Sequence, residues 1–299
     1  MGFIRRTIYA GETVEVEEYF SNRYGNHDKR APRKNRTPEQ TREAYVRRQK
    51  KKVRWLLNAN FLDGVDALVT LSWRKGDKRP ETLEEVKEEA ARFIKRLRAE
   101  YERLGLTLKY IYCVEIGPRG SRHIHAVLSH AGKLPIITLF RCWDGLVDVK
   151  PLYSGEYGEL ADYLVKGYAM KTERTTGAEL KHCYECSRNL AKPVIEIEKI
   201  KEKDVRRDID PPEGFVLDRS SVQEGVGKVT GRPYRFYKLR WIGENCAGAN
   251  RRVEHGEPRR RRKKQKKPLR EVESAVKMVT GAVKRAFGWV KEKLPWNNR

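Results

Sequence analysis

Two histidines and one glutamate are placed where a β-hairpin would bring them together. The stretch from Tyr110 to His130 reads YIYCVEIGPRGSRHIHAVLSH, two strand-like runs separated by a turn rich in Gly, Pro and Ser. Side chains alternate faces along a strand, so His123 and His125 share one face. Folding the hairpin about Arg119 sets Glu115 opposite His123 and diagonal to His125. Two imidazoles and one carboxylate on a rigid support predict a divalent-metal site with open coordination positions.

The same residues are also compatible with a plain sheet surface, because a His-x-His pair on a strand can simply be two polar side chains facing water. Three features favour the metal site. The chain has six histidines, and two of them lie in this motif. Their neighbours Ile124 and Val127 are apolar, as in a packed sheet, and Glu115 falls at the matching hairpin position. The place of Glu115 depends on register, because a slip of one residue would turn its side chain to the other face.

A tyrosine and a lysine follow on a segment with helical character. Residues 158–172 read GELADYLVKGYAMKT, and an intervening strand is expected before them, within residues 131–153. Lys166 lies three residues after Tyr163, so a helix presents the phenol and the ammonium side by side. Taken alone, Tyr-x-x-Lys is common, and the pattern favours a packed tyrosine beside a solvated lysine.

In context these motifs resemble one family. The stretch RHIHAVL is similar to the HUH motif (His, hydrophobic, His) of the HUH endonucleases. NANF before an apolar strand, YLVK after the histidines and SRNL further on extend the similarity over residues 53–241. In this order the blocks resemble the rolling-circle replication initiators, or Rep proteins, of bacterial plasmids and phages. Tyr168 lies five residues after Tyr163, not the four of the two-tyrosine members, so we expect the single-tyrosine type, with Tyr168 as a structural residue or a backup.

The resemblance implies a DNA nickase, an endonuclease that also rejoins strands. Tyr163 would attack a phosphate of single-stranded origin DNA, leaving a free 3′-hydroxyl and a covalent 5′-phosphotyrosine link. A divalent cation, Mg²⁺ or Mn²⁺, held by His123, His125 and Glu115 would polarise the phosphate. The cation and Lys166 would favour the phenoxide, because tyrosine is a weak nucleophile as the phenol. No P-loop occurs in the sequence, so a host helicase is an expected partner.

The order of elements predicts an α+β fold. A strand over Ala67–Trp73, an amphipathic helix over 81–104 and then the hairpin favour a central antiparallel sheet, as in the ferredoxin-like HUH endonuclease fold, with helices mainly on one face. The expected domains are a basic N-terminal arm (1–52), the endonuclease domain (53–241), a basic disordered linker (242–270) and an amphipathic helix (271–294). That last helix could associate with itself or another protein, or lie on an anionic membrane.

Positive charge dominates the chain: Lys and Arg number 65 against 41 Asp and Glu, a net charge of +24. Such an excess is typical of proteins that bind a polyanion, either nucleic acid or an anionic membrane. With no long apolar run and no apolar signal sequence, we expect a protein of the bacterial cytoplasm. Five cysteines without a dense pattern fit reduced thiols. The candidate DNA-binding residues are Arg122, Arg188, Asn189, Arg259, Arg260, Arg261, Arg262, Lys263 and Lys264.

Two other functions fit parts of this pattern. A relaxase or a transposase of the same superfamily would use the same chemistry on different DNA ends. Relaxases usually carry a third histidine in the metal cluster, whereas Glu115 stands there in this chain, which favours a Rep protein. A basic nucleic-acid-binding protein without catalysis would explain the charge equally well. Metal-dependent cleavage separates that function from the others.

Overall fold

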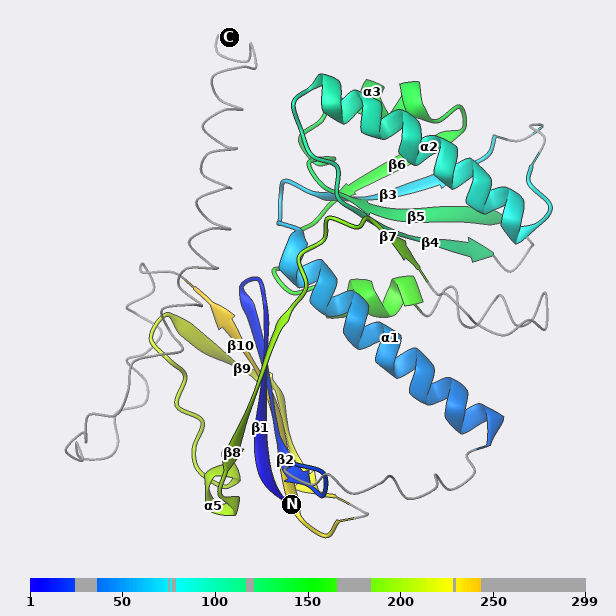
Figure 1. The fold of residues 1–299 in the computed structure, drawn as a ribbon. Helices are drawn as coiled ribbons and strands as arrows, with labels where there is room; N and C mark the ends of the chain where they lie inside the picture. Colours follow the sequence, from blue (N-terminus) through cyan, green and yellow to red (C-terminus); the bar gives the residue numbers. More distant parts are fainter. Residues whose placement is uncertain are drawn as a thin grey trace. The chain divides into compact units, whose positions relative to one another are not determined.

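The structure is a computed structural model of the chain and describes residues 1–24, 37–74, 76, 79–116, 121–165, 184–227 and 230–242. The chain divides into two compact units, one formed by Met1 with residues 21–196 and the other by residues 2–20 with 197–299. Each contains a five-stranded antiparallel sheet (Figure 1). The α+β class expected from the sequence is confirmed, and it applies to both units.

The sheet of the first unit contains the predicted hairpin. Its strand order is β6-β3-β5-β4-β7, so the hairpin strands β5 and β4 lie inside the sheet and are paired on both sides. The strands are β3 (Ala67–Ser72), β4 (Tyr110–Ile116), β5 (Arg122–Leu128), β6 (Leu146–Pro151) and β7 (Glu185–Cys186). A position inside a sheet fixes the hairpin register from both edges, which matters for any site built on these strands.

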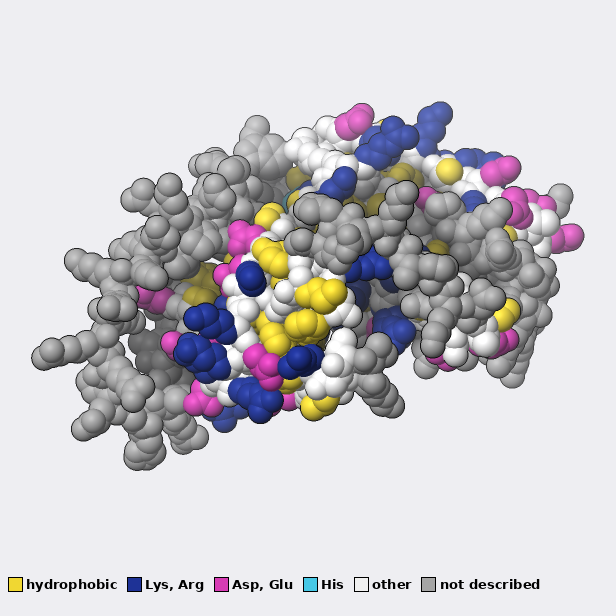
Figure 2. All heavy atoms as spheres, turned by 60° about the horizontal axis from the view of Figure 1, so that its bottom comes forward, with side chains coloured by type: hydrophobic (Ala, Val, Ile, Leu, Met, Phe, Trp, Pro, Cys, Tyr) yellow, Lys and Arg dark blue, Asp and Glu magenta, His cyan; other side chains and the backbone are white. Residues whose placement is uncertain are grey.

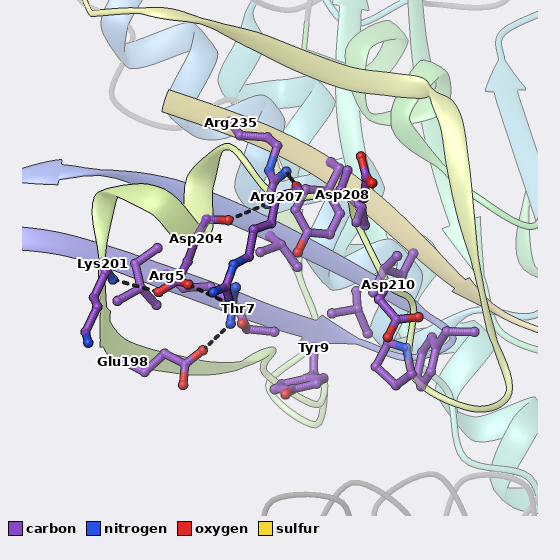
Figure 3. Close-up of a pocket in the computed structure, with 18 of the residues that line it drawn as sticks. Arg5, Thr7, Tyr9, Glu198, Lys201, Asp204, Arg207, Asp208, Asp210 and Arg235 are labelled. Carbon is purple, nitrogen blue, oxygen red and sulfur yellow. Dashed lines mark hydrogen bonds and ion pairs between the residues drawn. The ribbon is translucent and has the colours of Figure 1, made fainter. Parts of the chain in front are cut away.

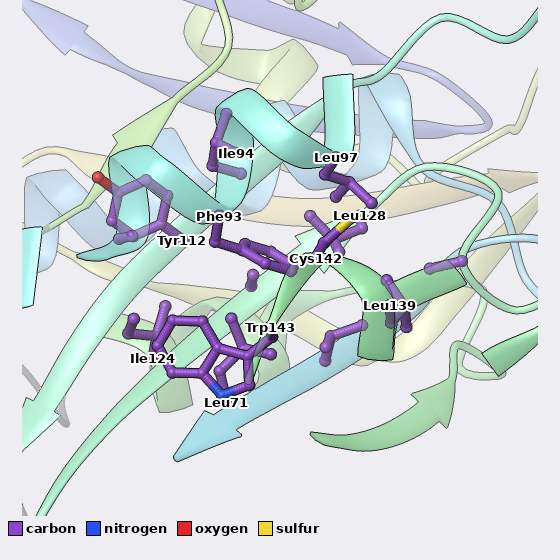
Figure 4. Packing of buried hydrophobic residues seen from close by; sticks show 14 of the residues in the cluster. Leu71, Phe93, Ile94, Leu97, Tyr112, Ile124, Leu128, Leu139, Cys142 and Trp143 are labelled. Atoms are coloured by element: carbon purple, nitrogen blue, oxygen red, sulfur yellow. The ribbon is translucent and has the colours of Figure 1, made fainter. Parts of the chain in front are cut away.

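Helices cover both faces of this sheet, so the expectation that they lie mainly on one face is wrong. On one face, α2 (Leu83–Arg103) and α3 (Ile136–Cys142) bury a cluster in which Leu71, Phe93 and Trp143 pack together (Figure 4). On the other face, α1 (Pro38–Asn60) and the helical residues 158–165 bury a second cluster. The physical reason is that β4 is apolar on both sides, since its residues alternate between the two clusters.

Capping residues set where the two long helices begin. The Thr37 hydroxyl accepts a hydrogen bond from the Gln40 N–H at 3.2 Å, and the Gln40 side chain accepts one from the Thr37 N–H at 3.4 Å, forming a capping box at the start of α1. Thr82 caps α2 in the same way through the Glu85 N–H. The bounds of α2 agree with the amphipathic helix expected over 81–104.

The second unit replaces the expected N-terminal arm. Strands β1 (Gly2–Ala10) and β2 (Thr13–Ser21) join β8 (Val194–Ile200), β9 (Phe215–Val226) and β10 (Pro233–Trp241) in the order β8-β1-β2-β10-β9, and α5 (Glu202–Val205) follows β8. The division at 52/53 also differs from the structure, because it falls inside α1. The N-terminal residues fold because β1 and β2 carry buried apolar residues on the sheet and their charged residues have partners there. Of the expected linker 242–270 and the expected helix 271–294, all but residue 242 lie outside the described residues.

A groove of about 760 Å³ lies on one side of this second sheet (Figure 3). Its floor is apolar, with Val16, Tyr237 and Leu239 from β2 and β10. The carboxylate of Glu18, fully buried, accepts from the guanidinium groups of both Arg5 and Arg235 at 2.7 Å. The arginines beside the groove are therefore held by carboxylates of the same unit.

Candidate active site

The hairpin places the predicted ligands on one face of the first sheet. In the register of β4 and β5, Glu115 lies opposite His123, and Cys113 lies opposite His125. The sequence prediction of this register is therefore confirmed. Because Cys113 belongs to the cluster covered by α1 and residues 158–165, the site lies on the face that those helices cover.

The helical residues 158–165 bring Tyr163 to the same place. Ala161, Leu164 and Val165 are buried against the sheet, whereas Tyr163 keeps 45 % of its surface exposed. Its hydroxyl oxygen lies 3.2 Å from Nε2 of His125 and donates a long hydrogen bond of 3.4 Å to Oε2 of Glu115. The ring meets the His125 ring edge to face at 5.1 Å between centroids. A phenol that is open to solvent thus contacts both an imidazole and a carboxylate.

His125 is held from both ring nitrogens. Its Nε2 lies 2.8 Å from Oε2 of Glu115, and its Nδ1 lies 3.2 Å from the hydroxyl oxygen of Thr70 on β3. The imidazole is nearly buried, with 6 % of the residue exposed. Because an ionised carboxylate can only accept a hydrogen bond, Nε2–H of His125 donates to Glu115, and the Thr70 hydroxyl pairs with Nδ1.

His123 lies on the same face of the sheet, but its side chain is not in position to share a cation with Glu115 and His125. Its Nε2 lies 3.3 Å from the Ser121 hydroxyl oxygen, and its ring centroid is 6.3 Å from that of His125. Among the described residues, no three His, Cys, Asp or Glu side chains stand in position to hold a metal ion. The chemistry of the donor set nevertheless fits a divalent cation, because Glu115 and His125 already meet and His123 lies opposite Glu115 on the same face. The contact of Thr70 with Nδ1 is the outer partner that metal-binding histidines usually have.

The electrostatics of the site keep Tyr163 protonated. Burial of the hydroxyl group, then the negative charge of Glu115 and the neighbouring Cys113, raise the pKa of Tyr163 to about 12. The described side chains thus act against the phenoxide, the reverse of the direction expected from a cation and Lys166. Lys166 and Tyr168 lie outside the described residues, so the expected pairing of Tyr163 with Lys166 stays a prediction.

Three predicted DNA-binding residues can be placed. The Arg122 guanidinium donates to the backbone carbonyl of Glu81, and Arg122 alternates with His123 along β5, so it lies on the face opposite the site. Asn189 donates to the Leu108 carbonyl at 3.0 Å, which ties the chain after β7 to the chain before β4, while Arg188 is exposed. The DNA-binding role expected for Arg188 and Asn189 stays a prediction. The basic run from Arg259 to Lys264 lies outside the described residues.

Thr70 is the site residue that the sequence did not reveal. It lies opposite His125 in the pairing of β3 with β5, and only that pairing brings the two together.

We expect Thr70→Val, which keeps the shape but removes the hydroxyl, to weaken Mn²⁺ binding by about 10- to 100-fold, as loss of an outer partner does in other metal sites. Titration of Mn²⁺ followed by calorimetry measures this. Thr70→Ser should restore the affinity, and equal affinities for all three proteins would contradict a role for the hydroxyl.

Residues 66–173 match the model of the family described as Replication-associated protein ORF2/G2P. This segment is therefore similar to that family over about a third of the chain. The matched segment includes Glu115, His123, His125, Tyr163 and Thr70, whereas the second unit lies outside it. No curated protein and no solved structure matches the chain.

The similarity of residues 66–173 to this replication-associated family supports a role in DNA replication. It agrees with the resemblance to replication initiators seen in the sequence, and the matched segment contains all five of these residues, although α1, which covers the same face, lies outside it. Within the part of the chain that the structure describes, no helix is both long enough and apolar enough to cross a membrane.

Proposed function

We propose that this protein is a rolling-circle replication initiator of a bacterial plasmid or phage. In this proposal it nicks and rejoins single-stranded origin DNA through a covalent 5′-phosphotyrosine on Tyr163. The observation that carries the proposal is the meeting of the exposed Tyr163 hydroxyl with His125 and Glu115 inside the segment that matches a replication family. A phenol placed against an acid–base pair is the arrangement that a tyrosine nucleophile needs.

The proposed chemistry is a transfer of one phosphodiester bond. The Tyr163 oxygen attacks the phosphorus, a new oxygen–phosphorus bond forms, and the bond from phosphorus to the 3′-oxygen of the preceding nucleotide breaks. The phenolic proton goes to the Glu115 carboxylate, whose Oε2 lies 3.4 Å from the Tyr163 oxygen, and the departing 3′-oxygen takes up a proton from solvent. The phosphotyrosine link retains the bond energy, so the 3′-hydroxyl can attack it in reverse and rejoin the strand without ATP.

The residues around Tyr163 also suit a divalent cation. Glu115, His125 and His123 would hold it, and Mg²⁺ or Mn²⁺ is favoured by a carboxylate mixed with imidazoles. When bound, the cation supplies positive charge to a non-bridging phosphate oxygen and offsets the charge of Glu115. Lys166, three residues after Tyr163, is proposed as a second positive charge at the same phosphate.

A cleavage assay tests the proposal. Labelled single-stranded oligonucleotides tiled across the parent replicon are incubated with the protein in Mn²⁺ or in EDTA, and products are separated under denaturing conditions. We expect one oligonucleotide to give a shorter strand with a 3′-hydroxyl and a protein-linked strand, both of them absent in EDTA. Tight binding of all oligonucleotides without any adduct would instead support a binding protein without catalysis. A preference for transfer-origin or transposon-end sequences would identify a relaxase or a transposase.

The proposed partners follow from the reaction. Single-stranded origin DNA is the substrate, and a host helicase with the host replication machinery would extend the free 3′-hydroxyl in the bacterial cytoplasm. The segment 271–294, with its apolar stripe, stays a candidate for association with itself or with another protein.

A further inference from the structure

We propose that the exposed basic side chains of α1 bind the phosphates of the single strand that enters the site, so that α1 guides the substrate to Tyr163. The proposal rests on the function proposed above and names the part of the first unit that holds the substrate. Neither the family match, which begins at residue 66, nor the sequence motifs assign this role to α1.

Positive charge is concentrated on α1 among the described elements. The helix carries seven Lys and Arg against two Asp and Glu. By contrast, α2, on the opposite face of the sheet, carries six of each, and the described residues of the second unit carry twelve of each. Because phosphate binding depends on local excess charge, α1 is the described element that best suits a polyanion.

The helix is fixed beside the segment that carries Tyr163. The Lys50 ammonium donates to the Asp162 carboxylate at 2.8 Å, and the Tyr157 N–H donates to the Asn58 side chain at 3.0 Å. Going along α1 from Lys50 to Asn58, the contacted residues go backward from Asp162 to Tyr157. The two segments therefore run antiparallel. The middle of α1, at Lys50, is therefore held against Asp162, the residue before Tyr163.

The side chains needed for phosphate contacts are on the outer surface of α1. Val53 and Leu57 face the sheet, whereas Arg47, Arg48 and Lys52 are exposed. The Arg48 guanidinium lies over the ring of Tyr45, at 5.7 Å from its centroid. Stacking of this kind holds the arginine outward with its donors free to reach a phosphate.

The second unit is a weaker candidate for the same strand. Arg5 and Arg235 beside its groove are each paired with Glu18, and Arg207 is paired with Asp204 at 3.1 Å. On the face drawn in Figure 2, Lys and Arg side chains are interspersed with Asp and Glu around apolar side chains. A phosphate there would have to displace a carboxylate that is already in place.

Two triple variants of the full chain with the same loss of charge test the proposal. One is Arg47→Gln, Arg48→Gln and Lys52→Gln on α1, and the other is Lys87→Gln, Lys95→Gln and Arg98→Gln on α2. Binding of a labelled oligothymidylate is measured by anisotropy over a range of salt concentrations. Each lost phosphate contact lowers the slope of log affinity against log salt by about 0.7 for a single strand, so we expect the α1 variant to lose about 2. The α2 variant should keep the slope of the original protein.

Equal slopes for both variants, whether lowered or unchanged, would overturn the proposal, because bulk charge or another surface would then govern binding. The α1 variant should also form less adduct when protein is limiting and recover at saturating protein. If the proposed function is wrong but α1 does bind DNA, the results differ. The α1 variant would then still show the lower salt dependence of binding, but no oligonucleotide would form an adduct with any of the proteins. Unchanged unfolding temperatures confirm that both variants remain folded.

Discussion

Tyr163→Phe is expected to abolish the covalent protein–DNA adduct while leaving single-stranded DNA binding intact. The change removes only the hydroxyl oxygen, which is the proposed attacking atom. The ring keeps its contact with His125, and the 45 % exposure of Tyr163 means that folding does not depend on the hydroxyl. Removal of a nucleophile commonly lowers turnover by more than about 10⁴-fold, so the adduct should fall below detection in a denaturing gel.

Tyr153→Phe is the matched control for this experiment. Tyr153 is a tyrosine of the same unit, 76 % exposed, and it should form the adduct at the original rate. An adduct that survives Tyr163→Phe would assign the nucleophile to another tyrosine, of which Tyr168 is the first to test. Equal anisotropy curves for both variants separate loss of chemistry from loss of substrate.

His125→Ala is expected to give the second-largest loss, a fall of roughly 10²- to 10⁴-fold in the cleavage rate at saturating DNA, with weaker Mn²⁺ binding. His125 contacts the Glu115 carboxylate and the Tyr163 hydroxyl at once, so its removal takes away a proposed cation ligand and a contact that positions both groups. A bound cation commonly supplies several kcal/mol of charge stabilisation in the transition state, and each 1.4 kcal/mol is about tenfold in rate. Single-turnover rates and calorimetric Mn²⁺ titration measure the two losses separately.

The control for His125→Ala is another histidine of the first unit. His130 has a positive φ of 60°, a conformation that asparagine tolerates, so His130→Asn should keep both the fold and the cleavage rate. In the original protein, EDTA should stop cleavage and added Mn²⁺ should restore it. Cleavage by His125→Ala at the original rate, with unchanged Mn²⁺ affinity, would contradict the site as proposed.

The parts of the site that depend on local sequence were predictable. Glu115 and His123 are eight residues apart on one hairpin, and strand alternation with a short turn fixes their pairing. The same alternation also places Arg122 on the opposite face, which weakens its assignment to DNA binding. Thr70 was not predictable, since its contact with His125 depends on a pairing across 55 residues that no local pattern encodes.

The fold, like the site, was predictable only where it depends on local sequence. The helices of the first unit follow from capping residues and apolar spacing, whereas the coverage of both sheet faces depends on how the chain packs as a whole. The second unit was missed because the polar, basic run over residues 21–40 made the whole of 1–52 resemble an arm. Glu15 and Glu18 are in fact buried, and the partner of Glu18 stands 217 residues later in the sequence, at Arg235.

The 217 residues between Glu18 and Arg235 affect how the chain folds during synthesis on the ribosome. The sheet of the first unit is complete once Cys186 has been made, whereas β2 has no neighbour in β10 until Trp241 emerges. Pairing across so many residues is slow, because the loop must close before the contacts form. During that interval the carboxylate of Glu18 is without Arg235, so the N-terminal hairpin must wait in solvent. The nascent chain is therefore expected to fold from its middle outward, with its first strands among the last to reach their final place.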